Sequence, residues 1–254
     1  MKIKEVAQVV EQKKLAEGVF SMRIQTKIAG QAVPGQFINI FSKDGSKLLP
    51  RPISICEIDS KKEQLRVVYR TVGAGTTEFS QLQAGDDVEV MGPLGNGFPL
   101  EGETAIVVGG GIGVPPMLEL AKQLSGSVTA VMGYRNDDLF LAEELIDASS
   151  ELIIATDDGS VGVKGTVVDA MVENDLKADV IYACGPKPML KGVAKYAEER
   201  GIKCYVSMEE RMACGVGACL GCVCQSKEVD DHSHVKNKRV CKDGPVFLST
   251  EVEL

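Results

Sequence analysis

Four of the chain's eight cysteines lie within one short segment, Cys214-Gly-Val-Gly-Ala-Cys-Leu-Gly-Cys-Val-Cys224. Cys214, Cys219 and Cys222 have the spacing C-x4-C-x2-C, which is the plant-type pattern of a [2Fe-2S] cluster and needs one more cysteine downstream. Cys224 and Cys241 are the candidates for the fourth ligand. We expect Cys241, because four ligands on one tight loop would all approach the cluster from one side, whereas the intervening loop can return Cys241 to the other iron.

Two other metal centres compete for this segment. A structural zinc site typically uses paired C-x2-4-C knuckles, and only one short pair is present here. His232 and His234 would suit a Rieske centre only if Cys and His pairs had matched spacings, so the stretch DDHSHVKNK is predicted to be a solvated loop. Glycines 215, 217 and 221 favour an iron-sulfur cluster, since they let the loop fold closely around sulfide and point N–H groups at it.

A second candidate site is the segment TAIVVGGGIGVPPMLELAKQL, whose pattern predicts a strand, a glycine turn and a helix. Its glycines let a phosphate approach the backbone, and the start of the helix offers unpaired N–H groups. Another turn, Cys184-Gly-Pro-Lys-Pro-Met189, follows a later strand and opens the next helix on the same sheet edge. The two turns together predict a dinucleotide site. A plain strand-to-helix turn, and ordinary core packing of Cys184, are the alternatives.

A third candidate site lies earlier in the chain. Arg51 and Arg70 can bind phosphate or a flavin edge, and Ser54 can offer its hydroxyl to a ring nitrogen. The run from Gly73 to Thr77 can present N–H and hydroxyl donors to a pyrophosphate. Taken singly, each of these features is also compatible with the turns of a barrel.

The elements that must position these residues fall into three regions. Short strand-like runs separated by turn signals predict a closed antiparallel β-barrel. Strands alternating with helices then predict a parallel sheet covered on both faces. We therefore predict a β-barrel domain over residues 1–100, an α/β nucleotide domain over 101–207 and a small cluster domain over 208–254. The predicted strands are 19–26, 36–41, 52–58, 64–70 and 87–92 in the barrel and 105–110, 128–133, 152–156, 179–184 and 203–208 in the sheet, with helices near 115–125, 137–148, 166–173 and 188–200.

Composition limits the function classes. A net charge of -8 without a long basic run argues against nucleic acid as a partner. The sequence has no apolar run long enough to span a bilayer and no secretory signal at its start, so a cytoplasmic protein is expected. In that reducing compartment, clustered cysteines favour metal or redox chemistry over disulfides.

The motifs GGGxGxxP and CGPxxM, with RPxS and a G-x-x-T segment before them, resemble the ferredoxin-NADP reductase superfamily. The resemblance implies a pyrophosphate on the glycine turn, nicotinamide near the Cys-Gly-Pro turn, and FAD rather than FMN in the barrel. It implies that NAD(H) is bound by Gly109, Gly111, Gly113, Cys184 and Gly185, and FAD by Arg51, Pro52, Ile53, Ser54, Val68, Tyr69, Arg70, Gly75, Thr76 and Thr77.

Nicotinamide gives two electrons as a hydride, a [2Fe-2S] cluster accepts one at a time, and a flavin does both, so the chemistry requires the order dinucleotide, flavin, cluster. Over nearly its whole length the chain is similar to the electron-transfer subunits of NAD-dependent (type B) dihydroorotate dehydrogenases. That resemblance implies an FMN-containing catalytic partner, a heterotetramer with two copies of each subunit, and a role in pyrimidine (UMP) biosynthesis. A subunit of a ferredoxin-NADP or sulfide-type flavin oxidoreductase is the alternative. NADH is preferred to NADPH by resemblance only, because Arg135 is compatible with either.

Overall fold

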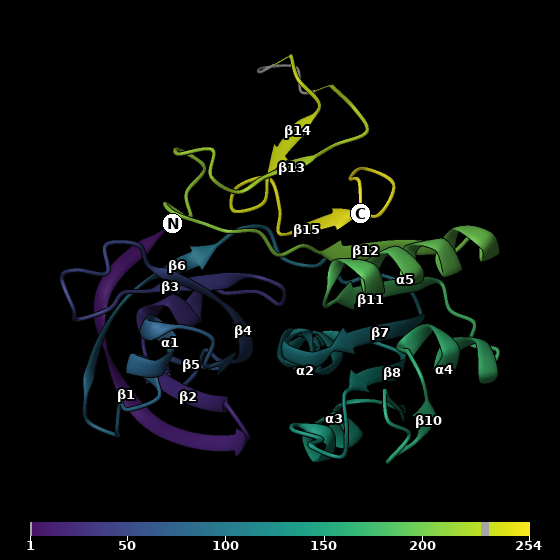
Figure 1. The fold of residues 1–254 in the computed structure, drawn as a ribbon, viewed down its shortest axis with the longest axis horizontal. Coiled ribbons are helices and arrows are strands. Elements are labelled where there is room, and N and C mark those ends of the chain that lie inside the picture. Colours follow the sequence, from purple (N-terminus) through teal and green to yellow (C-terminus); the bar gives the residue numbers. More distant parts are fainter. Residues whose placement is uncertain (1, 230–233) are drawn as a thin grey trace.

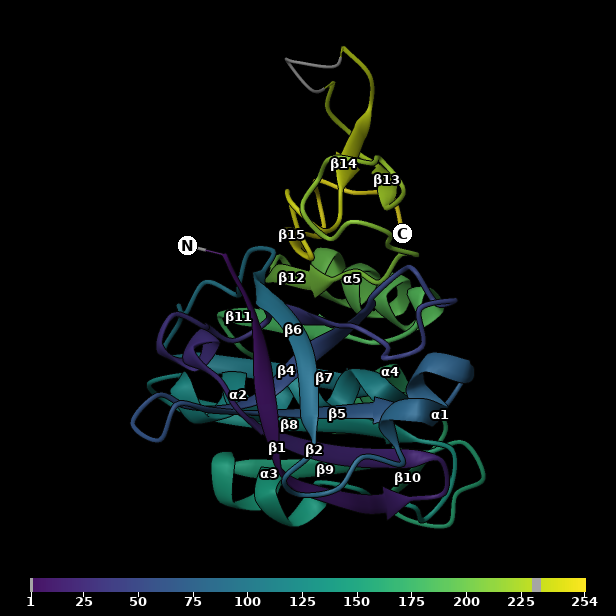
Figure 2. The ribbon, with the colours of Figure 1, turned by 90° about the vertical axis from the view of Figure 1, so that its left-hand side faces the viewer.

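The chain forms a closed barrel, a seven-stranded sheet covered by helices, and a C-terminal segment that lies over both (Figure 1). The computed structural model describes residues 2–229 and 234–254. His232 lies outside the described residues, whereas His234 is exposed, as expected for a solvated loop. The predicted loop extends too far, however, because Asn237 and Lys238 belong to strand β14 (Asn237–Arg239), which pairs with Val223–Gln225. In the view of Figure 2 the hairpin of the C-terminal segment projects from the top of the molecule.

The barrel has six antiparallel strands in the order β1-β2-β5-β4-β3-β6. Alternate residues of each strand point inward, as the two-residue period of a strand requires. Their apolar side chains form one buried cluster that includes Met22, Ile38, Ile55 and Tyr69. The bounds are β1 Ile3–Ala16, β2 Val19–Gln25, η1 Lys27–Gly30, β3 Phe37–Ile40, β4 Arg51–Asp59, β5 Gln64–Arg70, α1 Ala74–Phe79 and β6 Asp87–Leu94.

The longest strand of the barrel, β1, is absent from the sequence prediction. It pairs with both β2 and β6 and thereby closes the barrel. Only Ala7 and Val9 of this strand are buried, and its other residues are mostly Glu, Gln and Lys that face solvent or lie partly exposed. A strand with so short an apolar face gives a weak alternation, which explains why the pattern alone did not reveal it.

The sheet has the strand order β10-β9-β8-β7-β11-β12-β15, and the first six of these strands are parallel. Helices α2 and α3 pack on one face, and α4 and α5 on the other. The longest described helix has 14 residues, and none of the described helices is long and apolar enough to cross a membrane. The bounds are β7 Thr104–Gly110, η2 Gly111–Gly113, α2 Val114–Gln123, β8 Ser127–Tyr134, α3 Ala142–Ala148, β9 Glu151–Thr156, β10 Val163–Lys164, α4 Val167–Glu173, β11 Val180–Cys184, α5 Lys187–Arg200 and β12 Lys203–Ser207.

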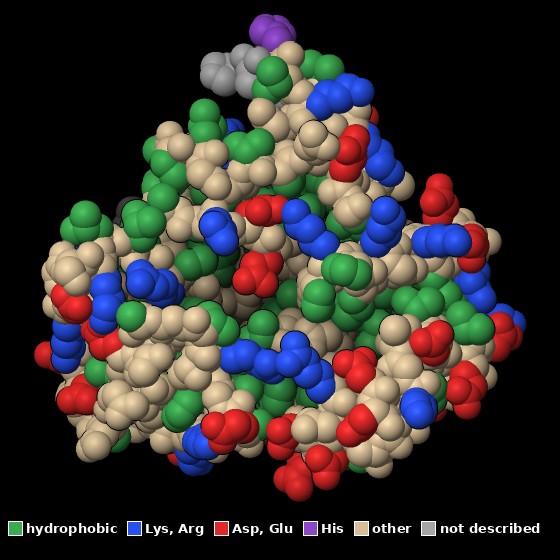
Figure 3. Space-filling view, viewed as in Figure 1, with side chains coloured by type: hydrophobic (Ala, Val, Ile, Leu, Met, Phe, Trp, Pro, Cys, Tyr) green, Lys and Arg blue, Asp and Glu red, His purple; other side chains and the backbone are tan. Residues whose placement is uncertain are grey.

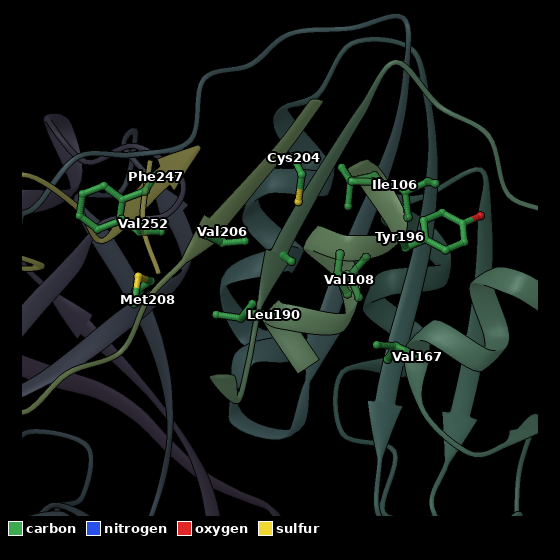
Figure 4. Packing of buried hydrophobic residues seen from close by; sticks show 14 of the residues in the cluster. Ile106, Val108, Val167, Leu190, Tyr196, Cys204, Val206, Met208, Phe247 and Val252 are labelled. Carbon is green, nitrogen blue, oxygen red and sulfur yellow. The ribbon is translucent and has the colours of Figure 1, made fainter. Parts of the chain in front are cut away.

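The C-terminal segment completes the sheet instead of standing apart from it. Its strand β15 (Val246–Leu248) pairs antiparallel with β12, while β13 (Val223–Gln225) and β14 (Asn237–Arg239) form a separate hairpin. Phe247 and Val252 belong to the same buried cluster as Met208, Val206 and Leu190 (Figure 4). The C-terminal segment that carries the cysteines is therefore held by the core of the nucleotide domain. The domain boundaries at 100 and 207 remain predictions.

Candidate functional site

The four cysteines expected to hold the cluster lie together as two pairs. The thiol of Cys214 is within hydrogen-bonding reach of Cys219, and the thiol of Cys241 is within the same reach of Cys222. Among residues 2–229 and 234–254, no three His, Cys, Asp or Glu side chains converge on the position of a single ion. A [2Fe-2S] cluster places two protein ligands on each of its two irons, so two cysteine pairs fit its donor set.

Backbone N–H groups surround the first of these sulfurs. The Sγ atom of Cys214 accepts hydrogen bonds from the N–H groups of Val216 and Ala218 at 3.4 and 3.3 Å. Burial acts to raise the pKa of Cys214, but these N–H donors outweigh it and lower that pKa below its usual value. The loop therefore favours the thiolate form, which is the form that ligates iron.

The remaining sulfurs have similar surroundings. The Sγ of Cys219 accepts from the N–H of Gly221 at 3.4 Å, and the Sγ of Cys222 accepts from the N–H of Cys241 at 3.3 Å. Burial, together with the neighbouring Cys222, raises the pKa of Cys241. Two adjacent buried thiolates repel each other, so a positive metal centre at this position would relieve that repulsion.

Two glycines shape this loop, as the sequence predicts. Gly215 has φ +69° and Gly217 has φ +85°, a backbone region that side chains rarely adopt. A Cβ at Gly215 would lie 2.4 Å from Nδ2 of Asn39, and a Cβ at Gly217 would lie 2.7 Å from Cδ of Lys242. Both positions thus require glycine for backbone conformation and for space.

Cys224 lies on the hairpin strand β13, where its residue pairs with Lys238 of β14. The side chain is buried, and burial raises the pKa of its thiol, with a further contribution from Glu210. The charged groups acting on Cys224 are therefore Glu210 and Lys187 rather than the other cysteines. This placement supports Cys241 as the fourth ligand.

Two asparagines of the barrel side hold the cluster segment in place, and neither is apparent from the sequence. Asn96 donates through Nδ2 to the carbonyl of Asp243 at 2.9 Å. Asn39 of β3 donates through Nδ2 to the carbonyl of Cys214 at 3.4 Å, and Asn39 is paired with Pro52 of β4. The loop carrying the first cluster cysteine therefore lies against the strands that carry the predicted flavin residues.

The two dinucleotide turns meet in space. A Cβ at Gly113, in the first turn, would lie 2.2 Å from the carbonyl oxygen of Cys184 and 2.7 Å from N of Gly185, in the second. Gly109 also has no room for a side chain, since a Cβ there would approach Met132 and Val114. The turns predicted to bind one dinucleotide are thus in direct contact at the carboxyl edge of the sheet.

Cys184 ends strand β11 beside Ser207, the last residue of β12. Burial raises the pKa of the Cys184 thiol to about 12, although the Ser207 hydroxyl acts in the opposite direction. The side chain is therefore a neutral thiol near pH 7 and does not act as a thiolate nucleophile.

The predicted flavin residues gather where β4, β5 and α1 meet. Gly75 lies directly under the Arg51 guanidinium, since a Cβ at Gly75 would be 2.5 Å from Nε of Arg51. The Nε of Arg70 is buried and has no hydrogen-bond partner among the residues that the structure describes. Thr76 accepts hydrogen bonds at Oγ1 from the N–H groups of Val72 and Gly73, which fixes the start of α1. A buried arginine N–H without a partner is suited to donate to a bound anionic group or to an acceptor atom of a bound ring.

Tyr69 and Val68 differ from the other members of this set. The Tyr69 ring points into the barrel core, where it contacts Phe20 and Phe79, and its hydroxyl accepts from Gln12 at 2.8 Å. Val68 faces the other way, into the cluster shared with helix α2. Only the backbone of Tyr69 is thus left to contact a flavin, and its proposed binding role is restricted to that backbone.

The three predicted sites lie around one junction. β12 ends beside the Cys184 turn and runs on into the cysteine segment, and Asn39 links that segment to the barrel. Figure 3 shows the surface hollowed where barrel, nucleotide domain and C-terminal segment meet, with charged side chains of both signs beside the hollow. The arrangement can place a dinucleotide, a flavin and a cluster next to one another.

Comparison with known proteins finds relatives of the C-terminal segment and of the whole chain. Residues 209–253 match the family model described as the iron-sulfur cluster binding domain of dihydroorotate dehydrogenase B. The chain is 44% identical over 261 residues to the protein named dihydroorotate dehydrogenase B (NAD(+)), electron transfer subunit, of Streptococcus mutans, with all of both chains covered. It is 46% identical over 255 residues to the protein of the same name from Geobacillus thermodenitrificans, with 97% of each covered.

Among solved structures, the NADH-dependent reduced ferredoxin-NADP oxidoreductase includes a chain 31% identical to this one. The TM-score is 0.87, and 98% of this chain and 90% of that chain are covered. The ferredoxin NADP+ reductase from Neisseria gonorrhoeae, solved with bound FAD and NADP, gives a TM-score of 0.66 at 16% identity, covering 82% and 94%. This second likeness concerns the fold alone.

Fold and site thus define a flavoprotein reductase of the ferredoxin-NADP reductase type that carries an iron-sulfur segment. The superfamily resemblance and the fold class expected from the sequence are confirmed. Within this class, the chain belongs to the family of electron transfer subunits of dihydroorotate dehydrogenase B (NAD(+)).

Proposed function

We propose that the chain passes electrons between a dihydroorotate-oxidising catalytic subunit and NAD+, through a [2Fe-2S] cluster and FAD, in the synthesis of UMP. The observation that carries the proposal is the contact of the Cys214 loop with Asn39, which sets the cluster segment beside the predicted flavin strands in a chain of this family. A flavin supplies the conversion between hydride transfer and single-electron transfer.

In this proposal side chains and backbone groups of the chain itself bind and orient the cofactors. Cys214, Cys219, Cys222 and Cys241 hold the cluster, and the N–H groups around their sulfurs stabilise its negative charge. The two touching turns hold NAD(H) through Gly109, Gly111, Gly113, Cys184 and Gly185. The proposed FAD residues are Arg51, Pro52, Ile53, Ser54, the backbone of Val68 and Tyr69, Arg70, Gly75, Thr76 and Thr77.

The proposed partner is an FMN-containing catalytic subunit, with two copies of each chain in a cytoplasmic heterotetramer. The relatives are named as subunits, which supports the existence of a catalytic partner. The copy number and the FMN rest on the resemblance of the sequence to the family.

Loss of Arg51 tests the flavin part of the proposal. Arg51→Ala removes the guanidinium above Gly75, and charge-assisted hydrogen bonds contribute about 1.5–3 kcal/mol, so we expect FAD affinity to fall by at least about tenfold. Equilibrium titration of the apoprotein with FAD measures the effect. Arg200→Ala, which removes an arginine that covers Tyr196 on α5, serves as the control. Equal FAD affinity in Arg51→Ala and the native protein would exclude Arg51 from the flavin site.

A second candidate function is electron exchange with ferredoxin. It is favoured by the 31% identical oxidoreductase chain, which is covered over 90% of its length. An NAD+-reduction assay separates the two functions when reduced ferredoxin is supplied as the electron donor in place of the catalytic subunit and dihydroorotate. Our proposal expects ferredoxin to support less than about a tenth of the rate reached with the catalytic subunit, since interface complementarity sets partner choice.

A further inference from the structure

A group of buried and half-buried charges joins the barrel to the nucleotide domain at the far end of β4. Glu57 of β4 accepts from Nη1 of Arg66 at 2.8 Å and from Nη2 of Arg23 at 3.1 Å, both within the barrel. Its other oxygen binds Nζ of Lys122, which comes from helix α2 of the nucleotide domain. One carboxylate thus holds side chains from both domains.

Two further contacts cross the same boundary. Glu119 of α2 accepts the backbone N–H of Ile58 on β4 at 2.8 Å, and the Glu119 side chain is also bonded to Gln123 at 2.6 Å. Arg66 reaches Glu144 of helix α3 at 3.3 Å. Glu119 is only 5% exposed, so this is an internal contact of the interface and not a surface ion pair.

The pKa of Glu57 favours a salt bridge between the two domains that persists at neutral pH. Burial acts to raise the pKa of Glu57, yet hydrogen bonds from Arg66 and Lys122 outweigh it and hold that pKa at about 2. Glu57 is therefore ionised throughout the neutral range and stays paired with Arg66, Arg23 and Lys122. Burial raises the pKa of Glu119. The hydrogen bonds that Glu119 accepts from Gln123 and Ile58 act to lower this pKa, but their effect is smaller than that of burial.

The linked elements are the ones that carry the two proposed redox sites. Strand β4 begins with Arg51 and ends beyond Glu57, and helix α2 begins just after Gly113 and contains Glu119 and Lys122. Helix α2 packs directly on β4 (Figure 1). Cys56 of β4 belongs to the same buried apolar cluster as the inward-facing residues of the helix. The angle between strand and helix therefore sets how the dinucleotide turn faces the flavin strand.

We infer that Glu119, Lys122 and Glu57 are positioning residues that fix the dinucleotide turn against the flavin strand and so control hydride transfer from a distance. The inference rests on the proposed function. A misplacement of about 1 Å can cost about a hundredfold in rate even when the substitution is far from the reacting atoms. These residues should consequently affect the rate of flavin reduction far more than the affinity for NADH.

The test uses the purified holoprotein and stopped-flow reduction of its FAD by NADH. Glu119→Leu removes the acceptor of the Ile58 N–H, and we expect the limiting rate constant to fall at least about tenfold, with the Kd for NADH within about threefold. Lys122→Met removes only the interdomain bond to Glu57 and should lower the rate about threefold. Glu119→Gln keeps an acceptor oxygen and should restore most of the rate. Exchange of the Ile58 amide hydrogen should accelerate in Glu119→Leu alone.

Lys203→Met is the matched control, because Lys203 pairs with Glu101 at 2.6 Å away from this boundary and is about as exposed as Lys122. A rate constant within twofold of native in Lys122→Met, or an equal loss in Lys203→Met, would overturn the inference. Lys122 is partly exposed on a helix, so its variant keeps the test valid even if Glu119→Leu fails to fold. A native protein whose FAD is not reduced by NADH would instead refute the proposed function.

Discussion

Cys241→Ser is expected to remove the iron-sulfur cluster while leaving FAD bound. Cys241 is paired with Cys222, and its own N–H donates to the Cys222 sulfur at 3.3 Å, so it sits where the second iron needs a ligand. Serine replaces a soft thiolate by a poor iron ligand. Iron and acid-labile sulfide per chain should drop to about a tenth or less of native, because each iron needs both of its protein ligands. Chemical analysis and the reduced-state EPR spectrum measure the loss.

Cys224→Ser is the matched control, since it changes the same atom in a cysteine two residues from a ligand. The Cys224 thiol faces Glu210 and the backbone of β14. The iron content and EPR spectrum of the Cys224→Ser variant should therefore equal those of the native protein. A buried thiol replaced by a hydroxyl costs some stability, which the thermal midpoint will report. Cluster loss in Cys224→Ser with retention in Cys241→Ser would mean that the ligand set is Cys214, Cys219, Cys222 and Cys224.

Gly113→Ala is expected to abolish reduction of the flavin by NADH. The new methyl group would lie 2.2 Å from the carbonyl oxygen of Cys184, and both atoms belong to structural turns that cannot rotate away. The turns must separate, at a cost of about 1–3 kcal/mol for overpacking. Because both turns are proposed to hold one dinucleotide, kcat/KM for NADH should fall at least about a hundredfold. FAD and iron content should be unchanged.

Gly30→Ala provides the comparison for this substitution. Gly30 has open space around its Cα and no positive φ, so the same added methyl group should leave NADH kinetics unchanged. Steady-state rates with an artificial electron acceptor, measured beside the thermal midpoints of both variants, separate a local effect from unfolding. Native kinetics in Gly113→Ala would show that the contact between the turns has no part in dinucleotide binding.

Much of the fold follows from local patterns in the sequence. The predicted strands at 19–26, 64–70 and 105–110 correspond to β2, β5 and β7, and the helix predicted near 188–200 corresponds to α5. These elements bury a clear apolar face, so periodicity identifies them. Helix α3 starts at Ala142 instead of near 137, because residues 137–141 form turns and Leu141 has φ +66°.

The elements that the sequence did not reveal depend on distant partners. β1 owes its position to pairing with β2 and β6, and the three-residue β15 exists as a strand because β12 offers it an edge. Asn39 and Asn96 act across the boundary to the cluster segment, where no local motif marks them. For Asn96, the only local signal is its place in the glycine-rich run GPLGNGFPL. Three of the proposed cluster cysteines, by contrast, were predicted from their spacing, since iron ligation constrains residue type and distance together. The fourth, Cys241, needed an argument about the reach of the loop.

We propose that this chain connects a dihydroorotate-oxidising subunit to NAD+, and one assay tests this connection directly. The most direct measurement mixes the purified holoprotein with the FMN-containing catalytic subunit and follows NADH formation from dihydroorotate and NAD+, together with the mass of the complex. We expect NADH formation that requires both subunits, stops with Cys241→Ser, and comes from a complex with two copies of each chain. A catalytic subunit that binds this chain without any dihydroorotate-dependent NADH formation, or that fails to bind it, would show that the chain does not carry these electrons.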